Sequence, residues 1–213
     1  MANPQKIEVT HGEKRAVFTK TADGWTPDWF YLGDRPMLRF KDHEWLSIGH
    51  VHPSTAQTGR LLDDGSAVFE GVNRYGETEV RWLITVRPDP QSDGFTVDCA
   101  ITPAADIELL EAYATFETPY EYDGGETVTT VIGMNPVYKW KGPERLTPPI
   151  WENPAWVYSR PQAARITGPC NAPYLCQTIT DAADTPDRYI MVVGDWSTCK
   201  VHDVYANPTR NVA

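Results

Sequence analysis

A two-residue period of apolar side chains in the middle of this chain constrains its fold more than any other feature. In EVRWLITV, residues 79–86, apolar side chains alternate with Glu, Arg and Thr, and GFTVDCAI, residues 94–101, repeats the alternation. Successive side chains of a strand point to opposite faces, so this period predicts two strands that each bury one face. Between them, RPDPQSDG supplies prolines and an Asp-Gly step, which predicts an antiparallel hairpin.

The same reading extends along most of the chain. Further strand candidates lie at 6–10, 15–19, 66–72, 126–132, 163–167, 188–193 and 199–204. Residues 105–118 fit either a helix or a strand, and the neighbouring strands favour a strand. The chain has 18 prolines and 15 glycines at its joints and no long amphipathic helix. We therefore expect an all-β fold, an antiparallel β-sandwich or a barrel, in a single domain over residues 1–213.

Charge and hydropathy exclude several classes of partner. The net charge is −10 and no Lys/Arg cluster is present, so neither nucleic acid nor an anionic membrane surface is an expected partner. No stretch approaches the roughly 18–20 apolar residues of a membrane span. The start, MANPQKIEVTHGEKR, lacks the apolar region of a secretory signal, so we expect a cytoplasmic location unless a signal lies outside this sequence. The sequence predicts no cofactor.

Residues 133–161, GMNPVYKWKGPERLTPPIWENPAWVYSRP, combine three tryptophans, two tyrosines and six prolines. No regular period joins them, and the stretch is too long for a hairpin connection. Loops longer than about 12–15 residues in compact domains are usually functional or disordered. This one is too aromatic for disorder, so we expect a long, ordered, proline-rich loop.

The chemistry of this stretch suits a sugar. Trp and Tyr offer a flat apolar face with a polar edge, which matches the C–H face and hydroxyl rim of a pyranose. The candidate stacking residues are Trp140, Trp151, Trp156 and Tyr158. The candidate hydrogen-bonding residues are Glu152, Asn153 and Arg160. The alternative, weighed equally, is that these rings close one end of the sandwich or contact a partner domain or a second copy of the chain.

A histidine cluster lies in FKDHEWLSIGHVHP, residues 40–53. His50 and His52 are two apart, which places both imidazoles on one face of a strand, and Glu44 is a nearby carboxylate. A metal site is one reading, but surface histidines at this spacing are more common. We expect no metal, and place His50 and His52 at the rim of the sugar site. No pair of carboxylates stands out for acid–base catalysis among Glu121, Asp123, Glu152 and Asp195.

The four cysteines form no CxxC pair, which argues against a zinc ribbon. Cys99 lies in the alternating pattern of residues 94–101, so we expect a buried thiol. Cys170 and Cys176 are candidates for a disulfide in an oxidising compartment.

The order of features resembles a known family. The hairpin leads into LEAYATFETPYEYD, and the aromatic stretch follows. Over residues 60–205 this order resembles the β-supersandwich of the galactose mutarotase-like superfamily. The resemblance implies a supersandwich-like fold and a carbohydrate context, because this fold occurs in sugar-processing enzymes and as a module of glycoside hydrolases, phosphorylases and polysaccharide lyases. It also implies that the chain is either the N-terminal module of a longer enzyme or a compact relative.

The sequence thus predicts a carbohydrate-binding β-sandwich associated with glycoside-processing activity. Three alternatives stay open: a carbohydrate epimerase, lyase or hydrolase in its own right, a structural module that docks on a partner, and a metal-dependent cupin-like barrel.

Overall fold

A computed structural model describes a protein made almost entirely of antiparallel strands. It covers residues 4–49, 51–53, 55–108, 112–114, 116–117, 127–132, 135–141, 144–145, 158–160, 163–165, 174–180 and 186–193. Within these residues the one helical element is the three-residue 3₁₀ turn η1, Lys41–His43. The expected all-β, antiparallel sandwich is confirmed.

The chain divides into two compact units, Met1–Glu117 and Thr118–Ala213. That the whole chain forms a single domain stays a prediction.

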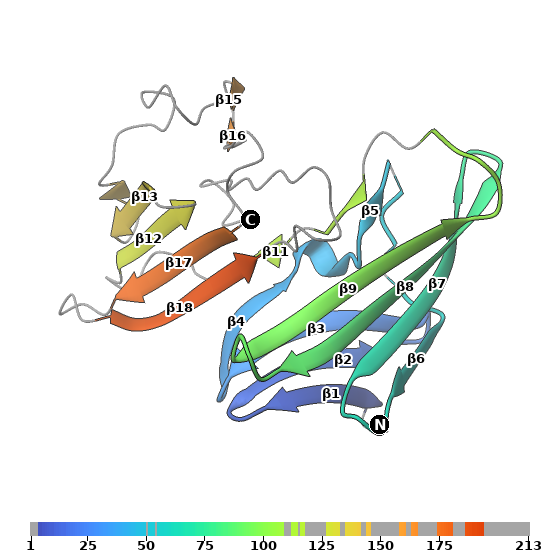
Figure 1. Ribbon diagram of the computed structural model, residues 1–213, viewed down its shortest axis with the longest axis horizontal. Helices are drawn as coiled ribbons and strands as arrows, with labels where there is room; N and C mark the ends of the chain where they lie inside the picture. The colour runs from blue at the N-terminus through green and yellow to red at the C-terminus, as the bar shows by residue number, and fades with distance from the viewer. Residues whose placement is uncertain are drawn as a thin grey trace. The chain divides into compact units, whose positions relative to one another are not determined.

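One layer of the first unit is a five-stranded antiparallel sheet in the order β1-β2-β3-β4-β11 (Figure 1). Its strands are β1 (Lys6–His11), β2 (Lys14–Lys20), β3 (Trp25–Leu32), β4 (Arg35–Phe40) and β11 (Phe116–Glu117). The register of β3 shifts against both of its neighbours, next to Ala16 in β2 and between Phe30 and Tyr31. Such β-bulges bend a strand and increase its twist.

The other layer is a four-stranded antiparallel sheet in the order β6-β7-β8-β9 (Figure 1). Its strands are β6 (Thr58–Leu61), β7 (Ala67–Tyr75), β8 (Thr78–Asp89) and β9 (Gly94–Pro103). Strands β8 and β9 pair without a break from Val80 opposite Pro103 to Asp89 opposite Gly94, which confirms the predicted hairpin. Two short strands, β5 (Ser47–Ile48) and β10 (Ala112–Tyr113), form a separate pair. Among the described residues of the range 105–118, β10 and β11 are the strands.

The core between the two layers is aromatic. The predicted inward-facing side chains of β8 (Val80, Trp82, Ile84 and Val86) are all buried, as the alternation requires. Trp45 lies at the centre, with ring centroids 5.5 Å from Phe18, 4.6 Å from Phe69 and 6.1 Å from Trp82. Its indole Nε1 donates a hydrogen bond to the carbonyl of Trp25 at 3.1 Å, so the polar edge of this buried ring is satisfied.

Trp82 packs against a strand position that has no side chain. Gly71 is its register partner on β7, and a Cβ on Gly71 would lie 2.1 Å from the indole. The indole Nε1 donates to the side-chain oxygen of Asn73 at 2.7 Å. The ring thus occupies the space above the glycine with its polar atom hydrogen-bonded.

The chain passes from one sheet to the other at residues 56–58. Ala56 and Trp25 of β3 exchange two backbone hydrogen bonds, each with an N···O distance of 2.8 Å. Thr58, two residues later, already pairs with Glu70 in the other sheet. The side-chain amide of Gln57 accepts from the Val72 N–H at 2.7 Å and donates to the Val72 carbonyl at 3.2 Å. One side chain thereby supplies the donor and acceptor that a paired peptide would supply.

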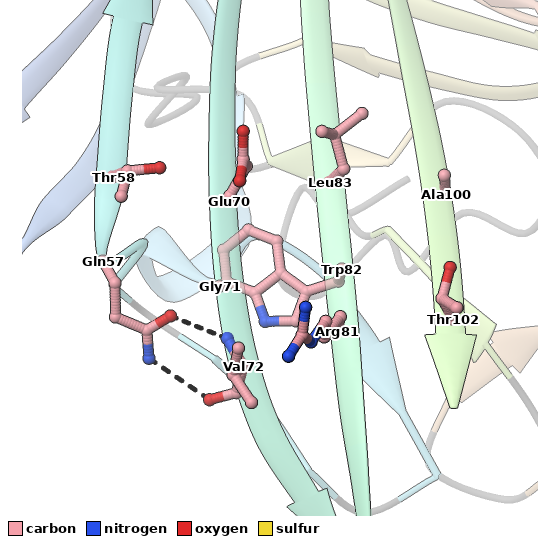
Figure 2. Close-up of a pocket in the computed structure, with 10 residues that line it drawn as sticks. All are labelled: Gln57, Thr58, Glu70, Gly71, Val72, Arg81, Trp82, Leu83, Ala100 and Thr102. Atoms are coloured by element: carbon pink, nitrogen blue, oxygen red, sulfur yellow. Dashed lines mark hydrogen bonds between the residues drawn. The ribbon is translucent and has the colours of Figure 1, made fainter. Parts of the chain in front are cut away.

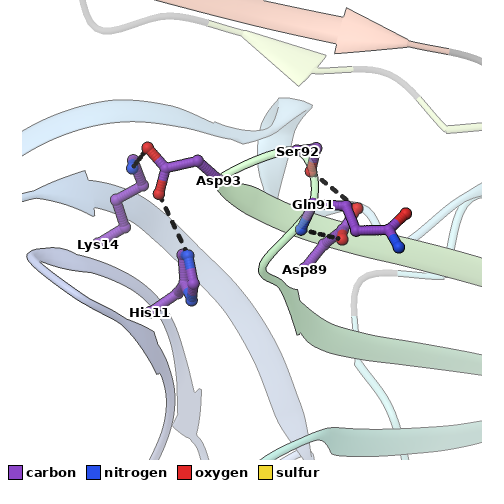
Figure 3. A network of polar contacts seen from close by, with 6 residues as sticks. All are labelled: His11, Lys14, Asp89, Gln91, Ser92 and Asp93. Carbon is purple, nitrogen blue, oxygen red and sulfur yellow. Dashed lines mark hydrogen bonds and ion pairs between the residues drawn. The ribbon is translucent and has the colours of Figure 1, made fainter.

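The turn between β8 and β9 is tied to the turn between β1 and β2 (Figure 3). The Asp93 carboxylate accepts from His11 Nε2 at 3.1 Å and from Lys14 Nζ at 2.8 Å. Within the turn, Asp89 accepts from the Gln91 N–H at 3.0 Å and from the Ser92 hydroxyl at 2.8 Å. These contacts link the two layers at this end of the sandwich.

Cys99 corrects an expectation. Its position on β9 was predicted to bury the thiol, but Cys99 is exposed. Strand β9 is the outermost strand of its sheet, so a side chain on its inner face has neighbours on one side only. Alternation shows which face a residue occupies, but it does not show how well that face is covered.

The second unit contains another five-stranded antiparallel sheet, in the order β14-β13-β12-β17-β18. Its strands are β12 (Thr127–Ile132), β13 (Asn135–Lys141), β14 (Glu144–Arg145), β17 (Tyr174–Thr180) and β18 (Pro186–Val193). A separate pair is formed by β15 (Tyr158–Arg160) and β16 (Ala163–Arg165). The predicted strands 126–132, 163–167 and 188–193 are confirmed over their described residues, 127–132, 163–165 and 188–193, whereas 199–204 lies outside the described residues.

The expectation that residues 133–161 form one continuous loop is wrong in its described part. Strand β13 pairs with β12 over most of its length, and β14 and β15 lie in the same stretch. Tyr138 and Trp140 alternate with Lys139 and Lys141, which is a strand pattern, and aromatic residues favour strands. The alternation covers only a few residues between prolines, so it was not recognised as a strand from the sequence.

Candidate functional site

A shallow groove crosses the outer face of the β6–β9 sheet (Figure 2). It has a volume of about 360 Å³. Its lining residues come from all four strands and from the residue before β6: Gln57, Thr58, Glu70, Gly71, Val72, Arg81, Trp82, Leu83, Ala100 and Thr102.

The strand register assembles this groove. One row across the sheet pairs Thr58 with Glu70, Glu70 with Leu83, and Leu83 with Ala100. The next row pairs Val72 with Arg81 and Arg81 with Thr102. All of these positions alternate with the buried residues of β8, so their side chains share the solvent face. From β6 to β9 the rows span three strand spacings, about 14 Å.

The groove has an apolar floor and a polar rim. Val72, Leu83 and Ala100 supply the apolar surface, and the small side chain of Ala100 leaves space above β9. The hydroxyl groups of Thr58, on β6, and Thr102, on β9, lie at the two ends of the groove (Figure 2). This combination fits an amphipathic ligand that has both C–H and hydroxyl groups.

The charged groups on this face are partly matched. Glu70 accepts from Arg60 Nη1 at 2.8 Å, and Arg87 is paired with Asp98. Arg81 is 75% exposed, and its contact with a carboxylate is 3.6 Å long, from Nε to Glu79. That distance is too long for a hydrogen bond, so the guanidinium keeps most of its donor capacity.

In the histidine cluster, His52 and His43 contact different partners. His52 Nδ1 lies 3.1 Å from the Glu44 carboxylate, and the predicted second member, His50, is outside the described residues. His43 Nδ1 donates to the Pro27 carbonyl at 2.8 Å, which fixes the ring against β3. Among the described residues, no group of three or more His, Cys, Asp or Glu side chains could hold a metal ion.

The predicted sugar-stacking residues lie in the second unit. Trp140 is on β13, opposite Val128 and Arg145. Tyr158 and Arg160 are two apart on β15, which places them on one face of that strand. The other predicted residues (Trp151, Glu152, Asn153 and Trp156) lie outside the described residues, as do Glu121, Asp123, Asp195 and Cys170.

Sequence reasoning missed the groove. Its polar residues are the solvent-facing half of ordinary alternating strands, and no motif marks them. Only the register of four strands brings Thr58, Glu70, Arg81 and Thr102 onto one surface.

Comparisons with known proteins found no match among protein-family models, curated proteins or solved structures. Within the described part of the chain, no helix has the length and apolar character needed to cross a membrane.

Proposed function

We propose that this protein binds carbohydrate, and that the groove on the β6–β9 sheet is a sugar site. The observation that carries the proposal is the combination of an apolar floor (Val72, Leu83 and Ala100) with rim groups that donate and accept hydrogen bonds. A pyranose has the complementary distribution, with C–H groups on its face and hydroxyls around its edge. A length of about 14 Å across the sheet gives room for a short oligosaccharide.

The groove favours binding over glycoside hydrolysis. Hydrolysis usually requires two carboxyl groups flanking the glycosidic bond. Glu70 is the one carboxylate among the residues that line the groove, and it accepts a hydrogen bond from Arg60 at 2.8 Å. The proposed role of the groove is therefore recognition, and the predicted link to glycoside-processing activity is through an associated enzyme.

The aromatic residues of the second unit are a separate part of the same proposal. Trp140, Trp151, Trp156 and Tyr158 would add stacking surface for sugar rings, and Glu152, Asn153 and Arg160 would bind hydroxyls. A double Trp151→Ala, Trp156→Ala variant tests this part by itself, because it leaves the groove unchanged.

The test of the groove is a glycan array, followed by calorimetric titration of the best glycan with the full chain. Ala100→Phe places a ring in the hollow at an exposed position, so we expect at least a tenfold loss of affinity in a folded protein. Ala22→Phe, at an exposed turn between β2 and β3, is the matched control and should bind normally. Wild-type affinity in Ala100→Phe would remove the groove from the proposal, and an array with no bound glycan would contradict carbohydrate binding itself.

A further inference from the structure

Arg81 is the cation of the groove with unused donors. Its guanidinium has five N–H groups, and its contact with Glu79 is through Nε at 3.6 Å. Figure 2 shows the side chain among the groove residues, between Val72 and Thr102. An exposed arginine whose terminal nitrogens have no carboxylate partner can bind a planar anion through two parallel hydrogen bonds.

Two of the carboxylates around Arg81 are paired with other arginines, whereas Glu79 contacts Arg81 itself through Nε at 3.6 Å. Glu70 is the one carboxylate in the groove lining, and Arg60 contacts it at 2.8 Å. On the other side of the groove, Asp98 is paired with Arg87. Glu70 and Asp98 therefore each have their own arginine, and the terminal nitrogens of Arg81 remain as hydrogen-bond donors beside the apolar floor.

We propose that the ligand of this groove is an acidic glycan, and that Arg81 binds the carboxylate of a uronic acid residue. This inference rests on the proposed function and specifies its ligand class. The sugar ring would lie on Leu83 and Ala100, and its hydroxyls would reach Thr58 and Thr102. The carboxylate would lie over Arg81, the next position across from Thr102 in the strand register.

Because the net charge of the protein is −10, binding of an acidic glycan would depend on the contact with Arg81 and not on the overall charge. The protein as a whole repels an acidic glycan, so the attraction acts only on a carboxylate that lies close to the Arg81 guanidinium. Exposed charges are screened over about 8–10 Å at physiological ionic strength. Added salt weakens the contact with Arg81 and also reduces the overall repulsion, so the discriminating measurement is a comparison of ligands at one fixed salt concentration.

The experiment is a calorimetric titration of the full chain with matched pairs of oligosaccharides. Each pair contains an oligomer of galacturonate, mannuronate, guluronate or glucuronate and its methyl ester, which keeps the ring and removes the charge. The variants are Arg81→Ala, Arg81→Lys and the matched control Arg74→Ala, an exposed arginine on β7 outside the groove. Circular dichroism and thermal midpoints establish that each variant is folded.

We expect at least one acid form to bind the wild type about ten- to a hundredfold more tightly than its ester, as for hydrogen bonds to a charged group. Arg81→Ala should abolish this preference, Arg81→Lys should keep part of it, and Arg74→Ala should leave it unchanged. Equal binding of acid and ester by the wild type would overturn the acidic-glycan inference and leave the proposed function standing. Failure to bind any acid, any ester and any neutral glycan of the array would overturn both.

Discussion

Gly71 shows how one residue can decide the packing of a large ring. A Cβ at this position would lie 2.1 Å from the buried indole of Trp82. Movement of the ring is restricted by Trp45, whose ring centroid lies 6.1 Å away, and by the hydrogen bond from Nε1 to Asn73 at 2.7 Å. The requirement at this position is space, not backbone conformation.

We expect Gly71→Ala to destabilise the protein by about 1–3 kcal/mol, the usual cost of overpacking a core. The measurement is the free energy of unfolding in urea. Gly94→Ala is the control, since a Cβ there meets the Ser92 hydroxyl at an ordinary 3.6 Å, and its stability should stay close to that of the wild type. Equal stability of the two variants would show that the Trp82 ring can move aside.

At the scale of an element, the β8–β9 turn is held by carboxylates. Hydrogen bonds from Ser92 and Gln91 lower the pKa of Asp89, and the Lys14 ammonium and its hydrogen bond lower the pKa of Asp93. A group whose pKa is lower in the folded protein stabilises the fold above its ordinary pKa. This contribution is lost as the pH falls through the lower, folded value.

Asp93→Asn should therefore lower the thermal midpoint at pH 6, and this effect should shrink as the pH falls below the ordinary Asp pKa of about 3.9. Asparagine suits this position, because Asp93 has a φ of 52° and Asn tolerates that left-handed conformation. The substitution thus removes charge and keeps the turn. The measurement is the difference in melting temperature between variant and wild type from pH 2 to 6, and a difference that does not change with pH would contradict the role of the charge.

Strands β8 and β9 were predictable from sequence, whereas strand β3 was not. Strand β8 was located because Val80, Trp82, Ile84 and Val86 alternate without a break, and β9 was located by the same period in GFTVDCAI. Strand β3 was missed, because WTPDWFYL contains a proline and two register shifts that disturb its alternation. The groove was missed for another reason: its residues are neighbours only through the pairing of four strands.

At the scale of the whole molecule, the described core lies within the first unit. Its buried residues run from Ile7 to Val86, and the partly buried residues packed against them extend to Ile107. The first unit, Met1–Glu117, contains all of these residues and both layers of the sandwich that encloses them. The groove also lies entirely within this unit.

A fragment of residues 1–117 should therefore fold alone, with a cooperative urea transition and the blue-shifted fluorescence of buried Trp25, Trp45 and Trp82. The measurements are tryptophan emission and equilibrium unfolding, with the full chain as reference. A non-cooperative transition, or emission typical of solvated indoles, would show that the second unit is needed to complete the first.

The amide of Gln57 has a consequence for how substitutions are tolerated. Its side chain is exposed, yet it both donates to and accepts from the backbone of Val72, at the corner where the chain changes sheets. Glutamate has the same shape but cannot donate when ionised, and Asn is one methylene too short to keep the same reach. In a scan of all single substitutions, position 57 should tolerate as few residues as a buried position does, although its side chain is exposed. The constraint is the placement of the amide Nε2 and Oε1 atoms against the backbone of Val72.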